Sequence, residues 1–344
     1  MVKVTPISSR KSDHIRINLE EDVHSSLTNG LEHFHFVHQA LPEQNLDEID
    51  LSLDLFSKRI KAPILISSMT GGTDEAGKIN ITLATAAQEC GVAIGLGSQR
   101  AAIDHPKIAY TYQVRKYAPD VLLFANLGAI QLNYNYSVDE CLRAVDMIQA
   151  DALILHLNAL QEALQPEGNT CFKGLLGQVE KVCRALNVPV IAKEVGWGIS
   201  GKTARMLADA GIRAIDVAGA GGTSWSQIEM HRAKTDSQAR LAANFIDWGI
   251  PTADSIIQVR KEVPEITIIA SGGLRNGIEI AKCLVLGAKL GGMASPFLKA
   301  ASHSEEMTVQ VIQEVKREIQ VCMFATGSGN LEQLERTQLI EENS

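Results

Sequence analysis

The sequence predicts an α/β protein with the (β/α)8 fold, the TIM barrel. Eight short, mostly apolar runs recur along the chain, beginning at Pro63, Val92, Val121, Asp151, Val188, Ala214, Ile266 and Ala288. Nearly continuous apolar runs are typical of parallel strands that are covered on both faces. Segments with helical signals lie between the runs, and such strand-and-helix units can close into a barrel. A doubly wound sheet is the alternative, although no G-x-G-x-x-G motif follows the first run.

Several of the helices between these runs have recognisable ends. Ser137 followed by Glu140 is a capping box, and residues 200–211 run from a serine cap to a terminating glycine. A last helix is expected from about Ser304 to Gly327, where it would complete the outer ring of helices.

Two stretches do not fit the repeat. Residues 1–60 and the segment from about 223 to 266 are each longer than an ordinary connection in a compact domain. We therefore expect an N-terminal extension over 1–60 that contributes to the substrate site. The (β/α)8 barrel would occupy 61–344, with an elaborated loop after its sixth strand.

Composition and charge exclude some classes of function. The formal net charge is −8 and Lys and Arg form no long blocks, which argues against binding to nucleic acid or to an anionic membrane surface. The six cysteines are scattered without a C-x-x-C pair, as in reduced proteins. Because the start has no apolar signal segment and no run of about 18 apolar residues occurs, we expect a cytoplasmic protein.

Polar or glycine-rich motifs stand at the ends of all the predicted strands. They are MTGG (69–72), GSQR (97–100), NLG (126–128), HLNALQE (156–162), KEVG (193–196), GAGGT (219–223), SGGLR (271–275) and MAS (293–295). The C-terminal ends of parallel barrel strands meet at one rim, where active sites are built. The motifs therefore predict a common pocket.

Glycine-rich turns after the last three strands predict a phosphate site. Their backbone N–H groups are open to an anion, and Arg275 adds positive charge. The alternative is that GAGGT and SGGLR are only tight turns.

Two further features of the rim indicate chemistry. His156 and Asn158 face the same way on a strand, while Gln161 and Glu162 extend into the following loop, so that the four could hold a metal-bound polyanion. Lys193 ends an apolar run, where a buried cation must be paired or used, and its neighbour Glu194 could be a purely structural partner.

Together these motifs resemble the type 2 isopentenyl-diphosphate isomerases, FMN-dependent (β/α)8-barrel enzymes that interconvert isopentenyl and dimethylallyl diphosphate. The resemblance covers nearly the whole chain. Its most specific elements are RKSDH (10–14), FVHQALPE (36–43), KAPILISSMTGGT (61–73), GLGSQR (95–100), HLNALQE (156–162), KEVGWGIS (193–200), DVAGAGGTSW (216–225) and ASGGLRNG (270–277).

The resemblance implies a set of ligand contacts. FMN would be bound by Ser68, Met69, Thr70, Ser98, Asn126, Lys193 and Thr223, with its phosphate on Gly273, Leu274, Arg275, Ala294 and Ser295. The substrate diphosphate would be held by Arg10, Lys11, Ser98, Gln99, Arg100, His156, Asn158 and Gln161, with Glu162 on a Mg²⁺ ion.

The resemblance also implies a mechanism and an assembly. NADPH or another reductant would reduce FMN, which then exchanges protons with the substrate without net electron transfer. Gln161, Lys193 and His156 would have the catalytic roles: Gln161 would orient the hydrocarbon end, and Lys193 would favour the anionic reduced flavin. The family resemblance implies a homotetramer or homo-octamer.

Two other classes of function share some of these features. An FMN-dependent 2-hydroxy-acid oxidase or nucleotide dehydrogenase would have the same barrel and phosphate loops, but the latter needs a nucleophilic cysteine and residues 223–265 contain none. A flavin-binding scaffold or sensor would have no need for the RK, SQR and HLNALQE motifs.

Overall fold

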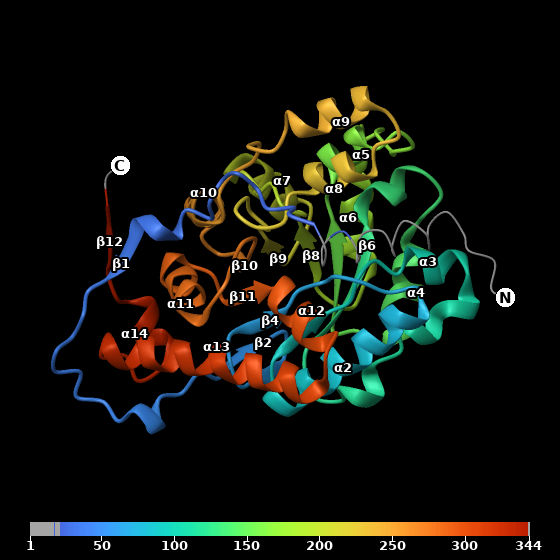
Figure 1. Ribbon diagram of the computed structural model, residues 1–344. Helices are drawn as coiled ribbons and strands as arrows, with labels where there is room; N and C mark the ends of the chain where they lie inside the picture. Colours follow the sequence, from blue (N-terminus) through green and yellow to red (C-terminus); the bar gives the residue numbers. More distant parts are fainter. Residues whose placement is uncertain (1–16, 18–20, 343–344) are drawn as a thin grey trace.

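The computed structural model describes residue 17 and residues 21–342, and within them eight parallel strands form a closed barrel (Figure 1). In order around the barrel these are β4 (Ile64–Ile66), β5 (Ala93–Gly95), β6 (Leu123–Gly128), β7 (Ala152–His156), β8 (Val190–Lys193), β9 (Ala214–Asp216), β10 (Thr267–Ser271) and β11 (Leu290–Met293). Each predicted apolar run contains one strand, so the predicted barrel is confirmed and the doubly wound alternative is wrong.

Long helices cover most of the outside of the barrel. They are α2 (Asp74–Cys90), α4 (Val138–Ile148), α6 (Leu175–Ala185), α7 (Gly201–Asp209), α10 (Thr252–Glu262), α11 (Gly277–Leu286) and α13 (Glu305–Ala325). Between β5 and β6 the chain instead forms α3 (Arg100–Asp104) and the 3-10 helices η3 (Pro106–Thr111) and η4 (Arg115–Tyr117). In the described part of the chain, no helix is both long and apolar enough to cross a membrane.

The predicted helix ends are confirmed at three places. The Ser137 side chain caps the start of α4, and the Glu140 carboxylate accepts a hydrogen bond from the Ser137 N–H at 2.8 Å. Ser200 caps α7, and Ser304 caps α13, which ends at Ala325. These side chains satisfy N–H groups that have no partner within their own helix.

Shorter elements complete the fold. They are α5 (Ala159–Leu164), α8 (Trp225–Arg232), α9 (Asp236–Ala243), α12 (Ser295–Ala301), α14 (Leu331–Glu335), η1 (Leu31–His33), η2 (Leu46–Glu48) and η5 (Ala129–Asn133). The elaborated loop expected after the sixth barrel strand contains α8 and α9, which lie beside α5 (Figure 1).

The described part of the N-terminal extension forms two small sheets. β1 (Phe34–Phe36) pairs with β12 (Leu339–Glu341) near the end of the chain, and β2 (Leu53–Leu55) pairs with β3 (Lys58–Ile60) as a hairpin. Leu55 and Ile60 of the hairpin join the apolar cluster inside the barrel, and the Phe56 ring meets Phe124 edge to face at 6.2 Å. The hairpin therefore closes the end of the barrel where the strands begin.

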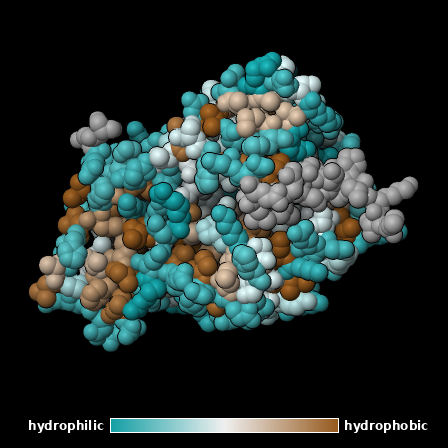
Figure 2. Space-filling model, viewed as in Figure 1, coloured by the Kyte–Doolittle hydropathy of each residue, from teal (hydrophilic) through white to brown (hydrophobic). Residues whose placement is uncertain are grey.

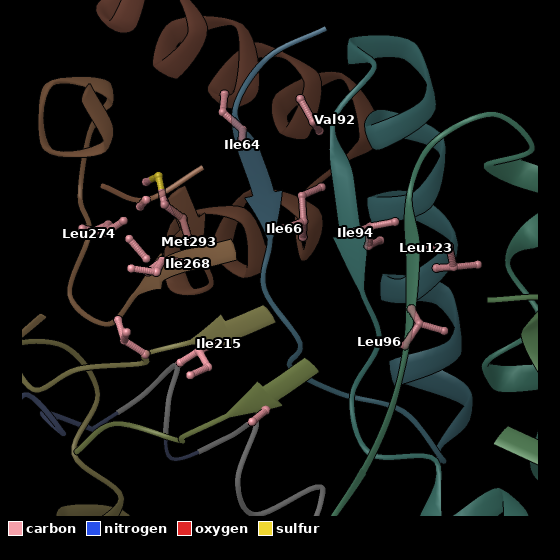
Figure 3. Packing of buried hydrophobic residues seen from close by; sticks show 14 of the residues in the cluster. Ile64, Ile66, Val92, Ile94, Leu96, Leu123, Ile215, Ile268, Leu274 and Met293 are labelled. Carbon is pink, nitrogen blue, oxygen red and sulfur yellow. The ribbon is translucent and has the colours of Figure 1, made fainter. Parts of the chain in front are cut away.

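Alternate residues of each strand belong to different parts of the core. Leu65 and Phe124 lie in the cluster inside the barrel, whereas Ile64, Ile66 and Leu123 pack with the helices (Figure 3). Because both faces of every strand are buried, most residues on both faces are apolar, which explains the nearly continuous apolar runs of the sequence. On the face in Figure 2, hydrophilic residues predominate and hydrophobic ones are scattered among them.

Asp151 connects the closing hairpin to the barrel. Its carboxylate lies 3.0 Å from Lys58 Nζ of β3 and 2.7 Å from Arg115 Nη2, and it accepts the Leu123 N–H at 2.8 Å. The Asp151 side chain is 18% exposed, so water could replace its partners only in part if they were lost. Two cations and one strand N–H thus share this carboxylate, although both cations also donate to backbone carbonyls such as that of Val121.

We predict that Asp151→Asn lowers the free energy of unfolding by about 2–3 kcal/mol, because it leaves two half-buried cations with an uncharged partner. The measurement is urea denaturation followed by circular dichroism. Asp54→Asn is the matched control: Asp54 pairs with Arg59 at 3.2 Å, but its side chain is 71% exposed, and we expect a loss below about 0.5 kcal/mol. Equal losses in the two variants would contradict the prediction.

Candidate active site

The C-terminal rim of the barrel carries the predicted site residues that the structure describes. Asn126 lies in β6, His156 ends β7 and Lys193 ends β8. Others lie in the connections after strands or at the starts of the next helices: Ser68, Met69, Thr70, Ser98, Gln99, Arg100, Asn158, Gln161, Glu162, Thr223, Gly273, Leu274, Arg275, Ala294 and Ser295. The expectation that the motifs share one rim is confirmed. Arg10 and Lys11 lie outside the described residues.

Lys193 is paired inside the barrel with Asp216 of the next strand. Its Nζ lies 3.1 Å from Asp216 Oδ2 and donates to Ser271 Oγ at 3.1 Å, and the Ser271 hydroxyl donates to Asp216 Oδ1 at 2.5 Å. All three residues are buried. Asp216 was not among the predicted site residues, although a charged residue within the apolar run AIDVAGA is a visible signal.

Glu194 is not the partner of Lys193. Its Oε2 accepts hydrogen bonds from the N–H groups of Val195, Gly196 and Trp197 at 2.6–2.8 Å, which fixes the turn after β8. Burial raises the pKa of Glu194 to about 7, although the three N–H groups favour its ionised form. Glu194 also lines a mostly apolar cavity of about 780 Å³ between α6 and α7, outside the barrel. The sequence-based alternative of a Lys193–Glu194 pair is therefore wrong.

His156 is oriented by Asn126 on the neighbouring strand. Its Nδ1 lies 2.8 Å from Asn126 Oδ1, and since an amide oxygen can only accept, this contact puts a proton on Nδ1. Behind Asn126, Gln99 is completely buried: its Oε1 accepts the Asn126 N–H at 3.0 Å and its Nε2 donates to the Ala144 carbonyl at 2.8 Å. The structure therefore brings His156 and Asn126 together but does not bring the Gln99 side chain into the pocket.

A second polar cluster follows β7. Asn158 Nδ2 donates to Gln161 Oε1 at 3.2 Å and to Glu162 Oε1 at 2.9 Å, and all three side chains are buried. Gln161 Nε2 in turn donates to Glu229 Oε1 at 3.2 Å, and Arg232 pairs with the other Glu229 oxygen at 2.6 Å. Sequence reasoning missed Glu229, which lies on α8 in the elaborated loop, where no motif marks it.

The atoms around Glu162 suit a hard cation. Glu162 Oε2 accepts the Asn169 N–H at 2.6 Å, and Asn158 Oδ1 is buried with no hydrogen-bond partner among the described residues. No group of three or more His, Cys, Asp or Glu that could hold a metal occurs within residues 17 and 21–342. A Mg²⁺ ion at Glu162 could therefore take Glu162 and the unused Asn158 Oδ1 as protein ligands, with further oxygen ligands from water or a substrate.

The two glycine-rich loops after β9 and β10 touch backbone to backbone. A Cβ on Gly272 would lie 2.1 Å from the Gly219 oxygen, and one on Gly273 would lie 2.3 Å from the Gly221 oxygen. This close approach is enough to require glycine at these positions, which is what the tight-turn alternative predicts. The N–H groups of Gly273 and Leu274 nevertheless donate to no other described residue, so they can still bind an anion.

Arg275 is partly neutralised at this site. Its Nε donates to Glu279 Oε1 at 2.9 Å and its backbone N–H donates to Glu279 Oε2 at 2.7 Å, while the side chain is 71% exposed. Hydrogen bonding to the Glu279 carboxylate raises the pKa of the guanidinium. An anion here would thus meet backbone N–H groups and one exposed, already paired cation.

The polar edge of the pocket near β4 also has unused groups. The hydroxyl oxygens of Ser67 and Ser68 are buried and have no hydrogen-bond partner among the described residues. Buried polar atoms of this kind usually have a partner, in the protein or in a ligand. Together with Lys193 across the barrel, they fit the polar edge of a flavin.

Comparison with known proteins places this site in a family. The model of the FMN-dependent dehydrogenase family matches residues 159–341. The isopentenyl-diphosphate delta-isomerase of Nostoc sp. is 55% identical, over 96% of this chain and 94% of that protein. Those of Synechocystis sp. and Rickettsia bellii are 54% and 50% identical, over 97% and 96% of this chain and 96% of each relative.

Solved structures show the same fold at much lower identity. A mandelate oxidase variant solved with an FMN adduct superimposes with a TM-score of 0.69 at 16% identity, over 97% of this chain and 100% of that one. This likeness concerns the barrel alone. The relatives at 50–55% identity decide the family: the chain belongs to the isopentenyl-diphosphate delta-isomerases of the type 2, FMN-dependent kind.

Proposed function

We propose that this chain interconverts isopentenyl diphosphate and dimethylallyl diphosphate, a step that supplies isoprenoid precursors, with reduced FMN and Mg²⁺. The observation that carries the proposal is the identity of 50–55% to isopentenyl-diphosphate delta-isomerases over nearly the whole chain. The rim supports it because one polar cluster surrounds Lys193, where a flavin fits, and another surrounds Glu162, where a metal-bound diphosphate fits.

The flavin would lie across the barrel mouth. We assign its ring contacts to Ser68, Met69, Thr70, Ser98, Asn126, Lys193 and Thr223, and its phosphate contacts to Gly273, Leu274, Arg275, Ala294 and Ser295. The buried Ser68 hydroxyl and the N–H groups of Gly273 and Leu274 support the assignment, since each has hydrogen-bonding capacity to offer. Lys193 would hold positive charge near the flavin.

The substrate diphosphate would lie beside α5. We assign it to Ser98, Arg100, His156, Asn158 and Gln161, with Arg10 and Lys11 from the N-terminal extension and Mg²⁺ on Glu162. Arg100 Nε is buried without a hydrogen-bond partner among the described residues, although it lies 3.7 Å from Asp104 Oδ2, and Asn158 Oδ1 is an unused oxygen next to Glu162. Gln99 is removed from the set of side-chain ligands, because both ends of its amide are already bonded within the protein.

The reaction moves a double bond by adding a proton at one carbon and removing one from a neighbouring carbon. Reduced FMN supplies the group that exchanges these protons. Gln161 cannot act as an acid, and its amide is held between Asn158 and Glu229, so it would orient the hydrocarbon end of the substrate. His156, fixed by Asn126, would bind the diphosphate and hold its position during the transfer.

Three further properties belong to this proposal: the reductant and the assembly rest on the family resemblance, and the location rests on the sequence pattern. NADPH would serve as the reductant, the protein would act in the cytoplasm, and it would assemble as a homotetramer or homo-octamer.

We expect the purified protein to contain FMN and not FAD, and to isomerise isopentenyl diphosphate only after the flavin is reduced. One anaerobic reduction should support many turnovers, because the reaction transfers no net electrons. Chromatography of the released cofactor and product analysis without oxygen test this. Equal activity of the oxidised enzyme, or one NADPH consumed per product, would sink the proposal.

We also expect Glu162→Gln to retain FMN but to lower kcat/KM about 100-fold, equivalent to about 2.7 kcal/mol, since a neutral amide is a poor ligand for a hard cation. The measurement is activity against Mg²⁺ concentration. Glu167→Gln is the matched control, because the Glu167 side chain is 84% exposed and pairs only loosely with Lys234 at 3.5 Å. An unchanged Mg²⁺ titration in Glu162→Gln would exclude Glu162 as the ligand.

A further inference from the structure

Three neighbouring strands supply a closed polar network inside the barrel. Lys193 ends β8, Asp216 ends β9 and Ser271 ends β10, and Lys193 stands directly opposite Asp216 in the strand register. Each member contacts the other two: Lys193 to Asp216 at 3.1 Å, Lys193 to Ser271 at 3.1 Å and Ser271 to Asp216 at 2.5 Å.

The carboxylate of Asp216 is the deepest charged group of this network. Its side chain is 1% exposed, whereas that of Lys193 is 11% exposed. A carboxylate so far from water is costly unless it is paired. Here Oδ1 accepts the Ser271 hydroxyl, whereas Oδ2 lies 3.1 Å from Lys193 Nζ as an ion pair without a hydrogen bond among the described residues. The ammonium of Lys193, on a flexible four-carbon stem, is therefore held at one place by two anchors.

Asp216 is the carboxylate that pairs directly with Lys193. Among the described residues it is the only acid within ion-pair distance of Lys193. Glu194, the chain neighbour, is engaged by three backbone N–H groups of its own turn. Asp216 therefore offsets the charge of Lys193 directly, while Glu194 interacts with it only at longer range.

We propose that Asp216 is a positioning residue that acts through Lys193 to set the reduction potential of bound FMN. The inference rests on the proposed function, in which Lys193 contacts the flavin. The carboxylate weakens the positive field of Lys193 and so limits how strongly the protein favours the anionic reduced flavin over the oxidised one. An enzyme that needs reduced flavin but does not consume it depends on the reduction potential of that flavin.

The first test is the midpoint potential of FMN bound to Asp216→Asn, measured by anaerobic dye titration without substrate. The variant keeps the shape of the side chain but loses its charge. We expect the preference for reduced over oxidised FMN to rise at least tenfold, a potential about 30 mV higher. Ser271→Ala keeps both charges and removes only one anchor, so the preference should change less than threefold in this control.

The second test asks whether Asp216 acts through Lys193. Lys193→Met alone should lower the potential, and adding Asp216→Asn to it should change the preference less than threefold. A full shift in that background would mean that Asp216 acts on the flavin independently, which overturns the proposal. An unchanged or lower potential in Asp216→Asn would also overturn the proposal. If that variant fails to fold, Asp216→Ser, which also removes the charge, replaces it, and an unchanged or lower potential in Asp216→Ser rejects the proposal.

These outcomes are separable from those of the proposed function. The potential is measured without substrate, whereas isomerisation is assayed on its own. If the unaltered protein retains no FMN, the proposed function fails. If the protein retains FMN but the FMN potential does not change when Asp216 is replaced, only the role of Asp216 is rejected.

Discussion

Closure of the barrel leaves the strand side chains two buried environments: the interior or the layer beneath the helices. An unpaired charge is costly in either place. Polar groups therefore either gather where the strands end or lie next to a partner of opposite charge. Lys193 and Asp216 satisfy this condition together, because adjacent strands place them side by side. The charged centre of the site is thus a consequence of strand register.

The two ends of the barrel are closed differently, and this determines where a ligand can enter. At one end the β2–β3 hairpin inserts Leu55 and Phe56 against the interior cluster, and Asp151 holds the hairpin in place. At the other end the buried hydroxyls of Ser67 and Ser68 lack partners among the described residues. Buried hydroxyls without a partner in the described part of the chain thus lie at this rim.

The fold was more predictable from the sequence than the site. Burial on both faces of a strand produces a continuous apolar run, so the strands could be found, whereas the partner of Lys193 could not be found by proximity in the chain. Consecutive strand residues point to opposite faces, which directs Glu194 away from Lys193, while Asp216 is distant in sequence but adjacent in register. The direction of the Gln99 side chain could not be predicted either, because the motif GSQR does not indicate which way the Gln99 amide faces.

The elaborated loop shows how a chain with a net charge of −8 can offer a site for a polyanion. Its helix α8 places Glu229 against Gln161, close to where a diphosphate would lie, and this acid would repel the ligand if it stood alone. Arg232, one turn along the same helix, pairs with Glu229 at 2.6 Å and offsets its charge. In the proposed site, anion binding would therefore depend on local compensation and on open backbone N–H groups rather than on the overall charge of the protein.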